Sequence, residues 1–153
     1  MLRISKLTDY GVVLSTHLAG LTEPKSVREL ALDTGLPEPT VAKVLKTLAK
    51  ADVVSSRRGA HGGYALSRSP DAISIVEVIT ALEGPIAVTE CTDESDDASC
   101  AHETHCAVRG NWQRINDAVL AALGAITLDE MARSSITLIT LSRSREQAQQ
   151  QRT

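Results

Sequence analysis

The sequence predicts a mainly α-helical fold with one two-stranded antiparallel hairpin and a long amphipathic helix in its second half. Apolar residues recur at helical spacing along most of the 153-residue chain. Ser26, Ser74 and Thr127 each stand three residues ahead of a Glu, a capping-box pattern that marks helix starts. Aromatic residues make up 2% of the chain and apolar residues 42%. The core must therefore consist of Leu, Val, Ile and Ala, which favours helices.

Three helices are expected in the first half, over residues 6–20, 27–34 and 40–51. Gly20 and Gly35 can end the first two, because glycine tolerates the backbone conformation found at a helix C-terminus. The second helix opens on the capping box of Ser26 and Glu29. Two prolines keep the connection to the third helix short.

A hairpin and three more helices are expected after residue 51. Two short strands at 52–56 and 64–66 flank the glycine-rich run RRGAHGG, which suits a hairpin tip. A capping box at Ser74 opens a helix that runs through Leu82. A long amphipathic helix is expected over 106–124, followed by a short closing helix that begins at the third capping box. Between these helices lies a polar, acidic, cysteine-bearing loop.

The net charge of −3 hides a strong asymmetry between the two halves. Residues 1–69 carry ten Lys/Arg and six Asp/Glu, a net charge of +4, whereas residues 70–153 carry a net charge of −7. The basic half can meet a polyanion. No apolar run is long enough to span a bilayer, and no secretory signal is present, so we expect a cytoplasmic protein with reduced thiols. We expect no enzyme, because the sequence has no nucleophile–base pairing and no phosphate-binding loop.

The basic half contains the pattern of a helix-turn-helix. Ala31, Gly35 and Val41 stand where this motif needs a small residue at the helix crossing, a turn residue tolerant of positive φ, and a β-branched core residue. The second helix presents side chains that can reach base edges or phosphates: Glu38, Thr40, Lys43, Lys46 and Thr47. The hairpin tip adds Arg57, Arg58, Gly59 and His61, where glycine lets the backbone approach a phosphate strand closely.

Two plainer interpretations of these residues remain open. The basic segment could be the solvated face of a small helical domain, and Glu38 and Thr40 could serve only as caps at the helix start. The basic hairpin directly downstream and the charge asymmetry favour DNA binding over the first interpretation.

The chain has three cysteines, Cys91, Cys100 and Cys106, in the spacing Cys-x8-Cys-x5-Cys. No two of them are two residues apart, which excludes the patterns of a zinc ribbon or a ferredoxin. Three interpretations remain open: an iron–sulfur cluster with three thiolates and one further ligand, a zinc site completed by His102 or His105, and free thiols with redox reactivity.

Taken together, these features resemble the IscR/NsrR superfamily of winged-helix regulators over residues 1–133. The motifs that carry the resemblance are LTDYG, the helix-turn-helix, RRGAHGGYAL, ISIVEVITALEGPI, the three cysteines and ITLDEMA after Trp112. Within the superfamily, the runs EGPIAVTEC and HETHC followed by NWQRIN are most similar to the regulator of the SUF iron–sulfur assembly system.

The resemblance implies a homodimer in which the helix over 106–124 crosses its partner. Two recognition helices would then meet successive major grooves of a dyad-symmetric operator. The resemblance also implies that the three cysteines bind an iron–sulfur cluster, of which [2Fe-2S] is favoured over [4Fe-4S].

The fourth ligand departs from one branch of the superfamily. The IscR branch has a His three residues after the last cysteine, where this chain has Arg109, which cannot ligate. In the NsrR branch an Asp of the first helix, supplied by the other subunit, completes the site, and Asp9 matches it. We therefore expect Asp9 of the partner subunit as the ligand, with His105 as second choice. A helix cap or an ion pair is the alternative role for Asp9.

Four regions follow from this interpretation: a winged helix-turn-helix DNA-binding domain over 1–84, a cysteine-bearing cluster loop over 85–105, dimerisation and closing helices over 106–133, and a disordered tail over 134–153. The expected function is a dimeric, iron–sulfur-dependent transcriptional regulator that represses genes of cluster assembly. The alternative is a zinc-containing or cluster-free repressor that responds to thiol oxidation. The expected partners are double-stranded DNA and a second copy of the chain, without a membrane or a small-molecule substrate.

Overall fold

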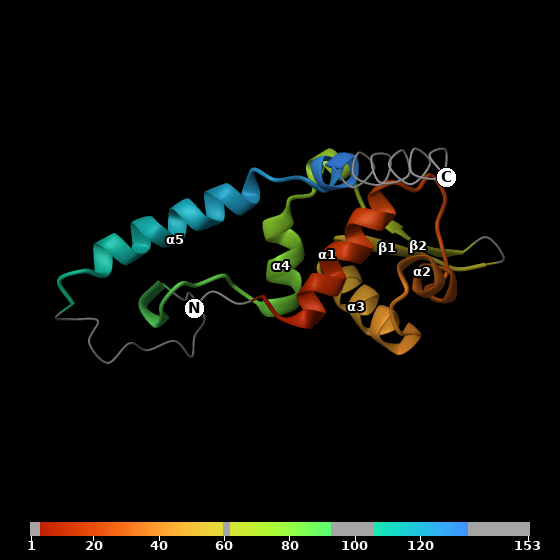
Figure 1. Ribbon diagram of the computed structural model, residues 1–153, viewed down its shortest axis with the longest axis horizontal. Coiled ribbons are helices and arrows are strands. Elements are labelled where there is room, and N and C mark those ends of the chain that lie inside the picture. Colours follow the sequence, from red (N-terminus) through yellow and green to blue (C-terminus); the bar gives the residue numbers. More distant parts are fainter. Residues whose placement is uncertain (1–3, 60–61, 93–105, 135–153) are drawn as a thin grey trace, which may run out of the picture.

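The computed structural model describes residues 4–59, 62–92 and 106–134. They form a compact body, which carries a hairpin on one side, and a long helix, α5, which extends from the opposite side (Figure 1). This arrangement of helices and one two-stranded antiparallel sheet confirms the predicted mainly α, winged helix-turn-helix class. No helix among the described residues combines the length and apolar character that crossing a membrane requires.

The first three helices are α1 (Lys6–Ala19), α2 (Val27–Thr34) and α3 (Glu38–Lys50). The capping box at the start of α2 is formed as predicted: the Ser26 amide donates to Glu29 Oε2 at 2.8 Å, and the Glu29 amide donates to Ser26 Oγ. Gly35 ends α2 with a φ of +68°, a left-handed conformation that favours glycine.

Helix α3 begins at Glu38, two residues earlier than predicted. Pro39 does not prevent this, because the first residues of a helix donate no intrahelical hydrogen bond and proline has no amide hydrogen to lose. The prolines therefore start the helix as well as shortening the connection before it. As a result, Glu38 belongs to the first turn of α3.

The wing consists of β1 (Val54–Arg57) and β2 (Gly63–Leu66), paired from Val54–Leu66 to Arg57–Gly63. The first strand begins later than predicted, because the Val53 amide still donates to Leu48 O at the end of α3 and Asp52 turns the chain with a φ of +57°. The segment before α2 joins the wing through two backbone hydrogen bonds between Lys25 and Tyr64.

Helix α4 (Ile75–Glu83) follows a short 3₁₀ turn, η1 (Pro70–Ala72), and packs against α1. A Cβ at Gly11 would lie 2.2 Å from Leu82 Cδ1, so these two helices approach each other closely. The core of the body consists of buried aliphatic side chains: Leu14, Leu18, Leu30, Val41, Val44, Leu45, Leu48, Val53, Val54, Ile73, Ile75, Val78, Ile79 and Leu128.

The chain leaves α4 through a second 3₁₀ turn, η2 (Glu90–Thr92), and resumes in α5 (Arg109–Gly124). Helix α5 begins three residues later than predicted, because Cys106 and the next two residues form a turn in which the Arg109 amide donates to Cys106 O. The far end of α5 is tied to the body, since the Ile75 amide donates to Ile126 O and the Leu128 amide donates to Ile73 O. Residues 128–134 form the closing helix.

Candidate functional site

One face of α3 is buried in the body and the other is free. Val41, Val44, Leu45 and Leu48 are inaccessible to solvent. The opposite face exposes Glu38, Lys43 and Lys46, with Thr40 half-buried. Thr47 belongs less clearly to this face, because its hydroxyl donates to Lys43 O.

The exposed cations of α3 and the wing have no acidic partner among the residues that the structure describes. Within the described residues no ion pair involves Lys43, Lys46, Arg57 or Arg58. Other cations of the chain do have partners: Lys25 with Asp33, Arg68 with Glu77, and Arg133 with Asp129. Positive charge that is not neutralised within the chain remains available to phosphates.

Arg57 ends β1, and Arg58 and Gly59 follow it towards the tip of the wing, all three exposed. Gly59 has a φ of +114°, a conformation that L side chains rarely adopt. His61 lies outside the described residues, so its predicted role stays a prediction. Gly63 is also required for packing within the chain, because a Cβ there would lie 2.5 Å from the Lys25 carbonyl carbon.

Lys25 is a second feature that sequence analysis missed. Its backbone pairing with Tyr64 holds the start of α2 against the wing, and its Nζ lies 2.5 Å from Asp33 Oδ2, with His17 Nε2 3.1 Å from the same oxygen. Hydrogen bonds from Lys25 and then His17 lower the pKa of Asp33. Arg28, in the first turn of α2, is exposed. No pattern in the sequence predicts a contact between Lys25 and the wing, which is 39 residues later.

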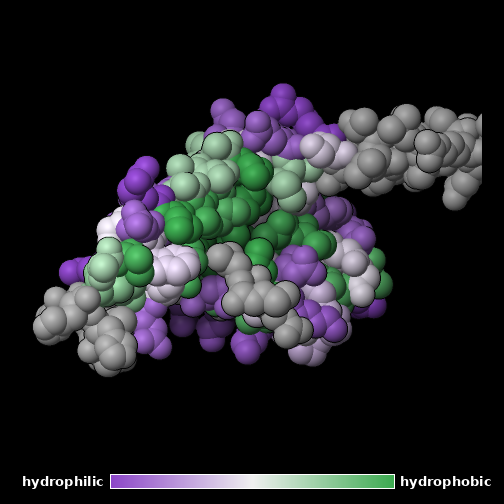
Figure 2. Space-filling view, turned by 60° about the vertical axis from the view of Figure 1, so that its left-hand side comes forward, coloured by the Kyte–Doolittle hydropathy of each residue, from purple (hydrophilic) through white to green (hydrophobic). Residues whose placement is uncertain are grey.

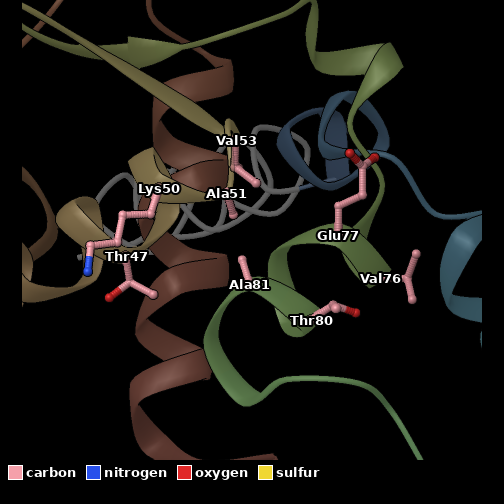
Figure 3. Close-up of a pocket in the computed structure, with 8 residues that line it drawn as sticks. All are labelled: Thr47, Lys50, Ala51, Val53, Val76, Glu77, Thr80 and Ala81. Carbon is pink, nitrogen blue, oxygen red and sulfur yellow. The ribbon is translucent and has the colours of Figure 1, made fainter. Parts of the chain in front are cut away.

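A shallow cavity of about 560 Å³ lies between the end of α3 and α4 (Figure 3). Its polar lining residues include Lys50, Glu77 and Thr80. Glu77 is already engaged, because it accepts hydrogen bonds from the Ser74 amide and from Arg68. The lining therefore offers no pair of groups arranged for acid–base or nucleophilic chemistry.

Cys91 lies in η2 and is half-buried. Its Sγ is 3.2 Å from the hydroxyl of Thr89. Thr92 closes this turn, since its amide and hydroxyl both donate to Thr89 O. The segment is anchored to α5, because the Val88 amide donates to Asn116 Oδ1 at 3.1 Å. The position of Cys91 is thus defined by hydrogen bonds within the chain.

Asn116 is the one residue of α5 that is buried, although it is polar. Sequence analysis missed it, because an Asn within an amphipathic pattern gives no indication of a partner 28 residues earlier.

Cys106 is a free, half-buried thiol just before α5. Cys100, His102 and His105 lie outside the described residues. Among the residues that the structure describes, no three His, Cys, Asp or Glu side chains come together in a group that could hold a metal. The assignment of three cysteine ligands therefore stays a prediction. Arg109 occupies the first position of α5.

Asp9 is exposed in the first turn of α1. The capping role belongs to Ser5, whose Oγ accepts a hydrogen bond from the Thr8 amide. Glu83 fixes this helix start to the end of α4, since Oε1 accepts from the Ser5 amide at 2.9 Å and from Thr8 Oγ1 at 2.5 Å. Hydrogen bonding from the Ser5 side chain, then from Thr8 and from the Ser5 amide, lowers the pKa of Glu83. Asp9 is therefore held in place by its backbone and is not needed as the cap.

An apolar groove of about 630 Å³ runs between α5 and the chain that leaves α4. Its lining includes Ile4, Ile79, Pro85, Ile86, Val88, Trp112, Val119 and Leu123. On α5, Ile115 is 45% exposed, and Val108, just before the helix, is 48% exposed. Figure 2, in which the end of the molecule that carries α5 is turned forward, shows hydrophobic surface gathered in the middle of this view.

Comparison with known proteins identifies the kind of protein that has this architecture. Residues 4–134 match the family Rrf2, described as iron-dependent transcriptional regulator. The transcriptional regulator CymR of Bacillus subtilis (strain 168) is 34% identical over 133 residues, which cover 86% of this chain and 90% of CymR. The solved structure of B. subtilis CymR, described as the global cysteine regulator, has a TM-score of 0.68 and 35% identity, covering 88% of this chain and 98% of that one.

A second solved structure, IscR of T. potens, has a TM-score of 0.66 and 29% identity, covering 88% of each chain. These similarities confirm the resemblance to the IscR/NsrR superfamily and the expectation of a DNA-binding regulator that is not an enzyme. The match extends over the body, the wing and α5 alike, and on this basis the chain belongs to the Rrf2 family of transcriptional regulators.

Proposed function

We propose that this protein is a homodimeric, cytoplasmic repressor that binds a dyad-symmetric DNA operator and responds to an iron–sulfur cluster. The observation that carries the proposal is the combination of two free thiols, Cys91 in η2 and Cys106 just before α5, with cations on α3 and the wing that form no ion pair among the described residues. The family description as iron-dependent regulators supports it.

In this proposal α3 enters the major groove and the wing follows the adjacent backbone. Lys43 and Lys46 contact phosphates or base edges, and Glu38 and Thr40, at the helix start, lie where base contacts are made in helix-turn-helix proteins. Arg57, Arg58, Gly59 and His61 approach the sugar–phosphate strand. The absence of ion pairs for the four cations within the described residues supports these roles.

We propose that the apolar face of α5 packs against α5 of a second copy of the chain. Val108, Trp112, Ile115 and Val119 follow one another at intervals of four, three and four residues, the spacing of a seam between two packed helices. A 16-residue helix that buries only one polar residue does not stabilise itself in water, since helix stability comes mainly from packing of an apolar face. Pairing through α5 would give two recognition helices related by a two-fold axis.

The chemistry of the donor set fits an iron–sulfur cluster. Cys91 and Cys106 are reduced thiols, and thiolate sulfur is the usual ligand of such clusters. Together with Cys100 they supply three sulfur ligands, and Asp9 of the partner subunit or His105 supplies the fourth. A bound cluster, [2Fe-2S] rather than [4Fe-4S] in our proposal, would supply sensitivity to oxidants and to iron supply.

The connection from the cysteines to the DNA surface runs through this chain's own contacts. Cys91 is anchored to α5 through Val88 and Asn116, and α4 is fixed to the start of α1 through Glu83. If Asp9 of the partner subunit ligates the same cluster as Cys91, the spacing of the two wings depends on that ligation. Ligation would then favour one spacing over another, a shift between two populations. We propose genes of the SUF cluster-assembly system as targets, on the motifs EGPIAVTEC and HETHC.

Protein purified without oxygen tests the proposal directly. We expect visible charge-transfer absorption, and iron and sulfide in equal amounts, with little zinc. Salt-dependent binding to a dyad operator should differ between this protein and the variant Cys91→Ser/Cys100→Ser/Cys106→Ser. A variant that binds and represses like the cluster-containing protein would refute the role of the cluster.

The dimer is tested separately with Ile115→Glu. A carboxylate at the seam faces its own copy and loses hydration, so the dimer should dissociate at least a hundredfold more readily in sedimentation equilibrium. Arg114→Glu, also exposed on α5 but off the seam, is the matched control. If Ile115→Glu stays dimeric at the same concentrations, α5 is not the interface.

A second candidate is a cluster-free or zinc-containing repressor that responds to thiol oxidation. The observation that favours it is the similarity to CymR, together with two half-exposed free thiols. A colourless protein that holds one zinc ion per chain, or none, and loses operator binding after oxidation would establish this alternative.

A further inference from the structure

The side chain of Thr89 contacts Cys91, one of the proposed cluster ligands. Its Oγ1 lies 3.2 Å from Cys91 Sγ, within hydrogen-bond distance of sulfur. Thr89 is half-buried, and Thr92, which closes the same turn, is 6% exposed. Thr89, Cys91 and Thr92 thus form a small, partly buried polar group beside α5.

The hydroxyl protons of Thr89 and Thr92 determine the direction of the hydrogen bond between Thr89 Oγ1 and Cys91 Sγ. Thr92 has one hydroxyl proton and donates it to Thr89 O at 2.9 Å. The Oγ1 of Thr92 in turn accepts from the Thr89 amide at 3.2 Å. The proton of the Thr89 hydroxyl is then free for one of two acceptors, Cys91 Sγ at 3.2 Å or Thr92 Oγ1 at 3.4 Å.

If Cys91 binds a metal, its protonation state determines which of the two acceptors the Thr89 hydroxyl uses. A thiol can donate or accept, but a thiolate has no proton and only accepts. A hydrogen bond to a charged acceptor is also stronger than one to a neutral hydroxyl. Once Cys91 is ligated, the Thr89 hydroxyl therefore donates to its sulfur.

We propose that Thr89 is a positioning residue of the cluster, which holds Cys91 in its ligating orientation and raises the reduction potential of the bound cluster through an O–H···S hydrogen bond. This inference rests on the proposed iron–sulfur function. Hydrogen bonds to ligand sulfurs are one of the means by which a protein sets cluster potential, because they stabilise the more negatively charged reduced state.

The anchoring of the turn makes the effect specific to Thr89. Val88 is held by Asn116, and the amide of Thr92 donates to Thr89 O, so the backbone does not rely on the Thr89 hydroxyl. Removing that hydroxyl should change the sulfur environment and leave the turn in place.

The test compares the wild-type protein with Thr89→Val, Thr89→Ser and Thr80→Val, each loaded with iron and sulfide without oxygen. Valine matches threonine in shape without the hydroxyl, serine keeps the hydroxyl, and Thr80 is an exposed threonine on α4 that serves as the matched control. We expect a more negative midpoint potential and a changed visible spectrum for Thr89→Val alone, with iron and sulfide contents near those of the wild type.

Two results would overturn the inference while leaving the proposed function intact: an unchanged midpoint potential in Thr89→Val, or the same shift in Thr89→Ser as in Thr89→Val. Loss of the cluster in Thr89→Val with retention in Thr89→Ser would support the positioning role. A wild-type protein without iron and sulfide would overturn the proposed function, and this inference with it.

Discussion

The body of this protein completes its own core, whereas the arm formed by residues 84–92 and α5 does not. In the body, Leu14, Leu30, Leu45 and Leu48 are inaccessible to solvent. In α5 the buried residue is Asn116, and large apolar side chains such as Ile115 stay partly exposed. Both regions have amphipathic helices. An amphipathic pattern therefore specifies an apolar face, but it does not specify whether the surface that covers this face belongs to the same chain.

The largest expected effect is the loss of core packing in the body. Leu45→Ala should lower the free energy of unfolding by about 2–5 kcal/mol, because it removes buried methyl groups and leaves a cavity. Ile115→Ala should act mainly through association, so its effect on the urea midpoint should depend on protein concentration. Unfolding curves at two concentrations, for both variants, measure this. Concentration-independent curves for the wild type and Ile115→Ala would contradict the distinction.

The next largest effect is expected from loss of the hydrogen bond between Val88 and Asn116, which joins residues 84–92 to α5. Asn116→Ala removes the acceptor of the Val88 amide and should destabilise the 84–92 segment by about 1–3 kcal/mol, the cost of a buried donor without a partner. Hydrogen exchange of the Val88 amide should accelerate, while amides within α3 keep their rates. Asn116→Asp, which keeps an acceptor, is the control. Equal acceleration throughout the body would show that the arm is not a separate unit.

A smaller effect is expected at the wing. Arg58→Ala should weaken DNA binding and reduce the slope of log affinity against log salt by about 1, the contribution of one phosphate contact. Its stability and iron content should match the wild type, because Arg58 is exposed and far along the chain from the cysteines. Arg133→Ala, in which an ion-paired cation of the closing helix is removed, is the control and should keep the full slope.

The smallest effect concerns acid stability at the junction of α1 and α4. Hydrogen bonds from Ser5 and Thr8 lower the pKa of Glu83 below its ordinary value of 4.5. A carboxyl whose pKa is depressed by folding stabilises the protein above its unfolded pKa, and this contribution is lost as pH falls through the lower folded value. Glu83→Gln should therefore flatten the loss of stability below pH 4.5. An unchanged acid profile in urea unfolding would show that these bonds contribute nothing net, since Glu83 is exposed and screened by water.

Much of the fold could be predicted because its signals are local. Capping boxes at Ser26 and Ser74 and a glycine at position 35 act within one or two helical turns, and the corresponding helices begin and end as expected. The predicted starts of α3 and α5 differ from the observed ones by two and three residues, respectively. Neither helix has a side-chain cap, so the sequence lacked the signal that places a boundary.

The candidate site could be predicted only in its residue types. The sequence showed which cations and which thiols are available. It did not show that Lys25 joins the wing, that Asn116 holds Val88, or that Thr89 lies against Cys91, because hydrogen bonds between distant segments have no periodicity along the chain.

The helical class, the helix-turn-helix, the basic wing and the presence of three thiols follow from the amino-acid sequence alone. These properties depend on local backbone preferences and on composition. The tertiary structure was needed to show which apolar faces meet within one chain, which described cations have no acidic partner among the described residues, and how the segment of Cys91 is anchored to α5. Those outcomes depend on distances between segments far apart in the chain, which packing alone sets.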